Sequence, residues 1–212
     1  MICSRINVSA VLVIMLLTAT AVFAADSAAD IKLRMGKGDP VNGKIKMAMC
    51  RSCHGEDGNG ASADFPKLSG QYAEYIQKQL YDFRSGARKN PIMAAMAASI
   101  ATDQDIVDLS AYFASLNKMS GDKPVANKAG EARFLSLANG CVSCHGDNGK
   151  GLAPDISHAP VIGGQYKEYL VRQMKSFRKG TRKNDPGGIM GTLTSEMTDE
   201  EIENVASYIS GL

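Results

Sequence analysis

The sequence lacks tryptophan, has only 6% aromatic residues, and shows almost no excess of one charge, with 24 basic and 22 acidic side chains. Nucleic-acid-binding proteins carry a strong basic excess, so this balance argues against a nucleic-acid partner. Histidine and cysteine are scarce, with three and five residues in 212. After the first 25 residues no apolar run is long enough to cross a bilayer. What remains has the length and composition of one medium or two small globular domains.

The N-terminal segment has a different character. Arg5 is the only charged residue before Asp26, and an apolar run from Val8 to Ala25 ends in small residues. A positive start, an apolar centre and a small-residue end are typical of a secretory signal peptide. We expect residues 1–24 to be removed and the rest to be exported. A signal kept as a membrane anchor is the alternative.

Four of the five cysteines lie in two copies of one motif, CRSCH at residues 50–54 and CVSCH at residues 141–145. Cys-x-x-Cys-His is the attachment motif of c-type haem. Residues three apart share one face of a helix, so both cysteines can reach one edge of a porphyrin while the histidine points at the iron. The predicted haem residues are Cys50, Cys53 and His54, and then Cys141, Cys144 and His145.

Three other uses of these cysteines fit less well. Zinc sites built from two CxxC pairs usually place the pairs 15–20 residues apart, which is far closer than here. A thioredoxin-like redox pair needs strands, and strand-like alternation is missing from the sequence. Simple disulfides would leave both histidines without a role.

The duplication extends beyond the cysteines. Residues 70–90 and 164–184 match at 12 of 21 positions, and residues 102–116 resemble residues 198–212. Apolar residues at helical spacing predict a helix in each of these segments, with Thr102 and Thr198 as N-caps. The prediction is an all-α chain with a first domain over residues 25–119, a linker over 120–127, and a second domain over 128–212.

A closed electron-transfer haem needs a second axial ligand, and methionine in that position raises the reduction potential. We expect Met93 and Met190, which lie in loops in corresponding places, to supply it. Met96 remains an alternative to Met93, whereas Met197 is expected to pack in the core. Further methionines are also expected to pack, namely Met47, Met49, Met119 and Met174.

A haem histidine usually donates its other ring N–H to an acceptor. Pro66 and Pro160 occupy matching positions before the two Gly-Gln-Tyr segments. The proline carbonyl can accept a hydrogen bond while its nitrogen cannot donate one. Both prolines are therefore predicted to orient the haem histidines.

Taken together, the sequence resembles the di-haem cytochrome c4 family over nearly all of its length after the signal. The resemblance rests on the two CxxCHG motifs, FPKLSGQY at residues 65–72, GGQY at 163–166, FRxG at 83–86 and 177–180, the methionine segments and the closing helices. It implies two class I cytochrome c domains related by a pseudo-twofold axis, with the haem propionates near their interface. By position, it also implies the ligand pairs His54 with Met93 and His145 with Met190.

The resemblance further implies single-electron transfer in the periplasm, from a membrane quinol-oxidising complex to a haem–copper terminal oxidase, by a soluble or loosely membrane-associated protein. A haem subunit of a periplasmic dehydrogenase, such as a flavocytochrome, is the main alternative. A di-haem peroxidase fits less well, because such an enzyme needs an open iron position and both methionine segments are present. The two haem environments differ in sequence, so we expect two distinct potentials.

Two further features have weaker interpretations. Basic residues follow each Gly-Gln-Tyr helix, and they are either solvated or available to neutralise haem propionates or contact a partner. They are Arg84, Arg88 and Lys89, and then Arg178, Lys179, Arg182 and Lys183. His158 has no counterpart in the first half and is expected to be a surface residue.

Overall fold

The computed structural model describes residues 38–60, 62–121, 125–136, 140–152 and 159–212, and these ranges contain helices and loops but no strand. The expected all-α fold is confirmed. The first half comprises α2 (Pro40–Lys46), η1 (Met47–Met49), α3 (Arg51–His54), α4 (Ala73–Ser85), α5 (Pro91–Ser99) and α6 (Asp103–Ser115). The second half comprises α7 (Lys128–Leu135), α8 (Val142–His145), α9 (Lys167–Arg178), η2 (Pro186–Gly188), α10 (Ile189–Ser195) and α11 (Asp199–Ser210). The signal segment and His158 lie outside the described residues.

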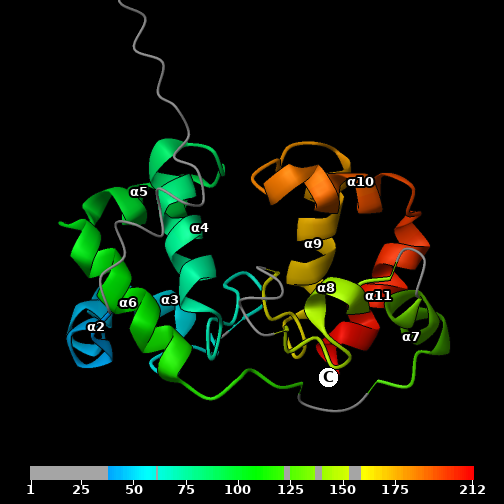
Figure 1. The fold of residues 1–212 in the computed structure, drawn as a ribbon, viewed down its shortest axis with the longest axis horizontal. Helices are drawn as coiled ribbons and strands as arrows, with labels where there is room; N and C mark the ends of the chain where they lie inside the picture. Colours follow the sequence, from blue (N-terminus) through cyan, green and yellow to red (C-terminus); the bar gives the residue numbers. More distant parts are fainter. Residues whose placement is uncertain (1–37, 61, 122–124, 137–139, 153–158) are drawn as a thin grey trace, which may run out of the picture.

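The two halves form two domains that face each other (Figure 1). Helices α4 and α9, one from each domain, line the centre of the molecule, while α2 and α7 lie at its opposite outer ends. Each domain therefore presents its Gly-Gln-Tyr helix to the other, as the pseudo-twofold arrangement requires.

The closing helices α6 and α11 begin where the sequence predicts. Thr102 accepts the N–H of Asp105 at 3.1 Å, and the Asp105 carboxylate accepts the N–H of Thr102 at 3.1 Å. Thr198 and Glu201 form the same reciprocal pair. Such capping boxes satisfy amide groups that the first helical turn leaves without partners. The apolar face of each closing helix is buried, as expected, in its own domain core.

Each closing helix is crossed closely by the first helix of its domain. Gly43 of α2 lies against the backbone of Asp108, and Gly130 of α7 lies against the backbone of Asn204. A side chain at either glycine would collide with the facing carbonyl group. The two glycines thus set how closely the helices approach.

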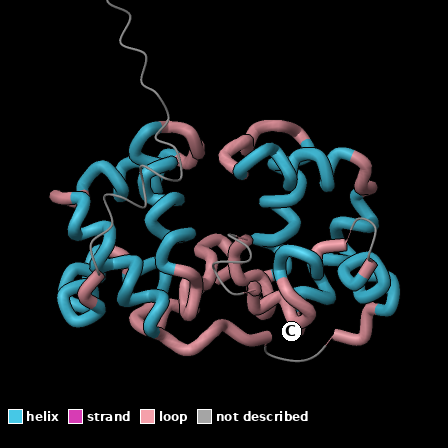
Figure 2. Tube along the Cα trace, in the orientation of Figure 1, coloured by secondary structure: helices cyan, strands magenta, loops and turns pink. Residues whose placement is uncertain are grey.

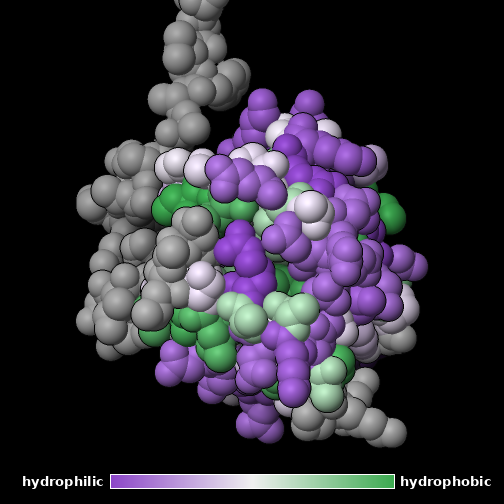
Figure 3. Space-filling view, turned by 90° about the vertical axis from the view of Figure 1, so that its right-hand side faces the viewer, coloured by the Kyte–Doolittle hydropathy of each residue, from purple (hydrophilic) through white to green (hydrophobic). Residues whose placement is uncertain are grey.

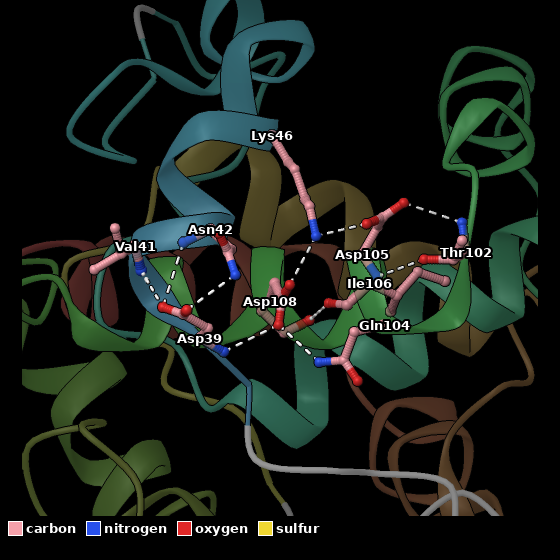
Figure 4. Close-up of polar contacts among 10 residues, drawn as sticks. Asp39, Val41, Asn42, Lys46, Thr102, Gln104, Asp105, Ile106 and Asp108 are labelled. Atoms are coloured by element: carbon pink, nitrogen blue, oxygen red, sulfur yellow. Dashed lines mark hydrogen bonds and ion pairs between the residues drawn. The ribbon is translucent and has the colours of Figure 1, made fainter.

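The first crossing is reinforced by charge (Figure 4). Lys46 of α2 reaches between two aspartates of α6, at 2.6 Å from Asp105 and 2.7 Å from Asp108. Asp108 also accepts the N–H of Asp39 at 3.0 Å and the amide of Gln104 at 2.8 Å. A buried carboxylate is tolerated when it is paired and fully hydrogen-bonded, as here.

Two sequence expectations on methionines are wrong. The segments of Met93 and Met190 are not loops but the helices α5 and α10. Asn90 caps α5 by accepting the N–H of Met93 at 2.9 Å, with Pro91 in the first turn, and Asp185 accepts the N–H of Met190 at 2.7 Å. Asn followed by Pro is a helix start that the sequence reading missed.

The expected packing role of Met49 is the second error, because this residue is 42% exposed at the end of η1. The other three methionines assigned to packing are buried, as expected, along with Met197. They are Met47, Met119 and Met174.

Loops from both domains meet between the two sets of helices (Figure 2). Tyr72 of the first domain donates its hydroxyl to the carbonyl of Leu152 in the second, and Tyr166 donates to the carbonyl of Asn59 at 2.9 Å. These two hydrogen bonds of Tyr72 and Tyr166 repeat about the pseudo-twofold axis and join the domains.

The outer end of the second domain is mostly hydrophilic, with smaller apolar patches (Figure 3).

Candidate functional site

Each CxxCH motif forms a single helical turn. The N–H of His54 donates to the carbonyl of Cys50 at 2.9 Å, and His145 makes the same bond to Cys141 at 2.9 Å. Gly55 and Gly146 end these turns with φ angles of 77° and 76°, which glycine adopts without strain. The turn places both cysteines and the histidine of each motif on a common short element.

The histidine rings are fixed from one side. Nδ1 of His54 lies 2.9 Å from the carbonyl oxygen of Pro66, and Nδ1 of His145 lies 2.8 Å from that of Pro160. A carbonyl oxygen can only accept, so each Nδ1 carries the proton and each Nε2 keeps its lone pair. The two prolines thus stand where the sequence predicts.

Burial lowers the pKa of His54 and of His145, and the proline carbonyls offset this effect only in part. Both rings are therefore neutral at pH 7. A neutral imidazole with a free Nε2 and a hydrogen-bonded Nδ1–H is the form that binds a metal.

The four described cysteines form no disulfide. Burial, with a smaller effect of neighbouring Cys53, raises the pKa of Cys50 to about 11, and burial likewise raises the pKa of Cys141. The first thiol of a reactive CxxC pair has a lowered pKa, so Cys50 and Cys141 do not resemble the attacking thiol of a thioredoxin-type pair. In the described part of the chain, moreover, no three His, Cys, Asp or Glu side chains converge to hold a metal ion by themselves.

The candidate methionines occupy corresponding helices. Met93 lies in the first turn of α5, which packs on α4, and Met190 lies in the first turn of α10, which packs on α9. Both are half-buried, and so is Met96. The choice between Met93 and Met96 therefore stays a prediction.

Two arginines of the predicted basic clusters are buried at the domain interface, each only 9% exposed. Arg88 donates to Tyr169 and Gln173 of the opposite domain, both at 2.9 Å. Arg182 reaches back to Tyr75 at 3.1 Å and Gln79 at 3.2 Å. The interpretation of these two as solvated side chains is thus excluded.

Among the described residues, every hydrogen-bond partner of these two guanidinium groups is a neutral side chain. Burial would raise the pKa of Tyr75, yet it lies below its ordinary value because Arg182 and Arg88 are close. Buried charges normally have a counter-charge. Asp82 is near enough to Arg88 to help raise its pKa, but its carboxylate bonds to Lys78 and Asn184. The interface thus suits a group that brings carboxylates, as the propionates of haem would.

Arg84 and Arg178, the other two arginines of these clusters, form ion pairs within their own domains. Arg84 pairs with Asp103 at 2.8 Å, and Arg178 pairs with Asp199. Both ion pairs are partly exposed and join the Gly-Gln-Tyr helix to the start of the closing helix of its domain. These ion pairs hold the two helix ends together, and a contact of either arginine with a haem propionate or a partner stays a prediction.

Sequence reasoning missed two interface residues, Gln71 and Gln165. Each is 4% exposed and bonds to the backbone of the opposite domain. Their signal was present, because the same glutamine stands just before the helix in both Gly-Gln-Tyr segments. It indicates a polar contact outside that helix.

A sequence model of the cytochrome c family matches residues 41–117 and again 129–212. The chain thus consists of two c-type cytochrome domains in tandem. Cytochrome c4 of Pseudomonas aeruginosa is 39% identical over 183 residues, covering 82% of this chain and 89% of that protein. The crystal structure of reduced recombinant cytochrome c4 from Pseudomonas stutzeri superposes with a TM-score of 0.75 at 37% identity, covering 82% of this chain and 99% of that one. The chain belongs to the cytochrome c4 family.

A further relative is named for a different role. The thiosulfate dehydrogenase electron acceptor of Stutzerimonas stutzeri is 39% identical over 176 residues, covering 77% of this chain and 78% of that protein. As a member of the cytochrome c4 family, the chain is an electron-transfer protein with two covalently bound haem c groups.

Within the described ranges, no helix has both the length and the apolarity needed to cross a membrane.

Proposed function

We propose that the two haems are held by residues in equivalent positions of the two domains. The first set is Cys50, Cys53, His54 and Met93, and the second is Cys141, Cys144, His145 and Met190. The observation that carries the proposal is the twofold His–Pro contact, which leaves one neutral imidazole in each domain with Nε2 free. Haem iron supplies the one-electron chemistry when bound, and these side chains attach and orient it.

The protein's part in electron transfer is to keep the structure around each haem nearly the same when the charge of the iron changes. Each histidine is held by a backbone carbonyl on a short loop that the opposite domain also contacts. Arg88 and Arg182 are placed to offset negative charge at the interface. Axial ligands, burial and hydrogen bonding are the means by which a protein sets a haem potential.

The expected signal and the family support a proposal for the cellular role. We place residues 1–24 as a cleaved signal, residues 25–119 and 128–212 as the two domains, 120–127 as the linker, and the mature protein in the periplasm. There it carries electrons from a quinol-oxidising complex of the membrane to a haem–copper terminal oxidase.

A periplasmic dehydrogenase is the second candidate donor. The relative described as a thiosulfate dehydrogenase electron acceptor favours it, because that protein spans a similar domain pair at 39% identity. The chemistry at the haems is the same in both cases. Only the surface that meets the donor differs.

Two measurements test the proposal. Peptide mass mapping should find the mass of haem on two peptides, one containing residues 50–54 and the other residues 141–145. Haem on only one peptide would overturn the assignment of sites. Stopped-flow reduction should then be faster with a purified quinol-oxidising complex than with thiosulfate and its dehydrogenase; the reverse order would favour the second candidate.

A further inference from the structure

One peptide group in the second domain is hydrogen-bonded at both ends by side chains of different domains. It joins Pro160 to Val161. Its carbonyl oxygen lies 2.8 Å from Nδ1 of His145, and its N–H donates to Oε1 of Gln71 at 2.9 Å. His145 belongs to the same domain as this peptide, whereas Gln71 belongs to the first domain.

The first domain contains the same arrangement with the roles exchanged. The peptide that joins Pro66 to Lys67 accepts from Nδ1 of His54 at 2.9 Å. Its N–H donates to Oε1 of Gln165, a second-domain residue, at 2.9 Å. Each glutamine therefore contacts the peptide that orients the haem histidine of the other domain.

Both glutamine side chains are held firmly. Nε2 of Gln71 donates to the carbonyl of Val161 at 2.8 Å, and Nε2 of Gln165 donates to that of Lys67 at 2.9 Å. Each Oε1 also accepts the N–H of the following tyrosine at 3.1 Å. With both ends of the amide engaged and 4% of the residue exposed, the orientation of each glutamine is determined.

A peptide group is planar and conjugated, so an acceptor on its N–H fixes the direction of its carbonyl and makes that oxygen a better acceptor. A better acceptor at Nδ1 makes the histidine a stronger donor to a metal at Nε2. We propose that Gln71 and Gln165 are positioning residues that set the haem potential of the opposite domain. The inference rests on the proposed function, in which His54 and His145 are haem ligands.

The glutamines are not needed merely to hold the domains together. The tyrosine that follows each of them makes its own cross-domain hydrogen bond, and Arg88 and Arg182 add further ones. None of these contacts touches the Pro–x peptides. Tyr72→Phe is therefore a matched control, because it removes a neighbouring interface contact and leaves the peptide alone.

The experiment is a redox titration of the full di-haem protein, followed by NMR of the two histidine Nδ1–H protons. The two waves are assigned with His54→Ala and His145→Ala, each of which should remove one wave. In Gln71→Met the Pro160 carbonyl becomes a weaker acceptor, which disfavours the ferric state of the second-domain haem. We expect its wave to shift to higher potential and the His145 proton signal to move, with the first-domain wave unchanged.

Gln165→Met should give the reciprocal result, and it tests the inference even if Gln71→Met does not fold. Tyr72→Phe should move neither wave. If a glutamine variant shifts only the wave of its own domain, or no wave, the cross-domain role is wrong while the ligand assignment stands. If His145→Ala keeps both waves unchanged, the proposed ligands themselves are wrong.

Discussion

The backbone of Gly43 lies so close to the carbonyl of Asp108 that a β-carbon at residue 43 would overlap it. This contact fixes the crossing of α2 over α6. We expect Gly43→Ala to lower the free energy of unfolding by about 1–3 kcal/mol, the usual cost of overpacking a close-packed contact. Chemical denaturation of the haem-loaded protein measures the change.

Gly191→Ala is the control for this variant. Gly191 lies within α10, and a β-carbon there would meet no other protein atom within 4 Å. Alanine is favoured over glycine in a helix, so this change should be neutral or stabilise by up to about 1 kcal/mol. Equal effects of the two substitutions would show that the α2–α6 crossing does not depend on the glycine.

Asp108 and Asp105 should make the first domain sensitive to acid. Burial would raise the pKa of Asp108, but hydrogen bonds from Asp39, Lys46 and Gln104 hold it below its ordinary value, and Lys46 likewise lowers the pKa of Asp105. Because these folded-state pKa values are depressed, the stabilisation is present above about pH 4 and is lost as the pH falls below it. The second domain has Asn204 where the first has Asp108.

Asp108→Asn tests this asymmetry. The variant should be less stable than the wild type at pH 7 and should lose less stability between pH 5 and pH 3. The measurement is urea unfolding across that range. An unchanged slope of stability against pH would show that Asp108 is not responsible.

The two haems should have distinct potentials, partly because of Phe65. Its ring meets that of His54 edge-on, with centroids 6.4 Å apart, whereas Ala159 occupies the matching position beside Pro160. Phe65→Ala should admit water near His54, favour the more highly charged ferric state and lower the first-domain potential. The second-domain wave of the same titration is the internal control, and equal movement of both waves would contradict a local effect.

Met93 and Met96 can be separated by substitution. Met93→Leu should remove half of the weak far-red absorption that marks a bond between methionine and ferric haem, and Met96→Leu should leave it intact. The opposite result would transfer the ligand role to Met96. Optical spectra at equal haem content decide between them.

The sequence predicts much of this molecule because the informative signals are local. The capping pattern of Thr102 and Asp105 predicts the start of α6. The CxxCH motif places three haem residues within five positions. Short-range patterns of this kind need no knowledge of the fold. The same holds for the apolar faces of the closing helices.

The features that were missed depend on packing between distant segments. From its place beside Lys89 in the sequence, Arg88 is expected to be a surface residue. It is buried because the opposite domain packs against it, where Arg88 bonds to Tyr169. Gln71 accepts a hydrogen bond from the N–H of Val161, which lies 90 residues further along the chain, so no local sequence pattern could predict this contact. Its repetition in both halves, like that of Tyr72 and Arg88, is a sequence signal that points to the interface.

The central claim is that both haems are closed by one histidine and one methionine and serve only to carry electrons. The most direct test is the optical spectrum of the oxidised protein, with covalent haem counted by mass on the same sample. The account predicts two haems, a far-red band of full strength for two methionine-bound irons, and no change on brief exposure of the oxidised protein to cyanide or of the reduced protein to carbon monoxide. Two haems with half of that band, or a spectrum that shifts with either ligand, would show an open iron and contradict it.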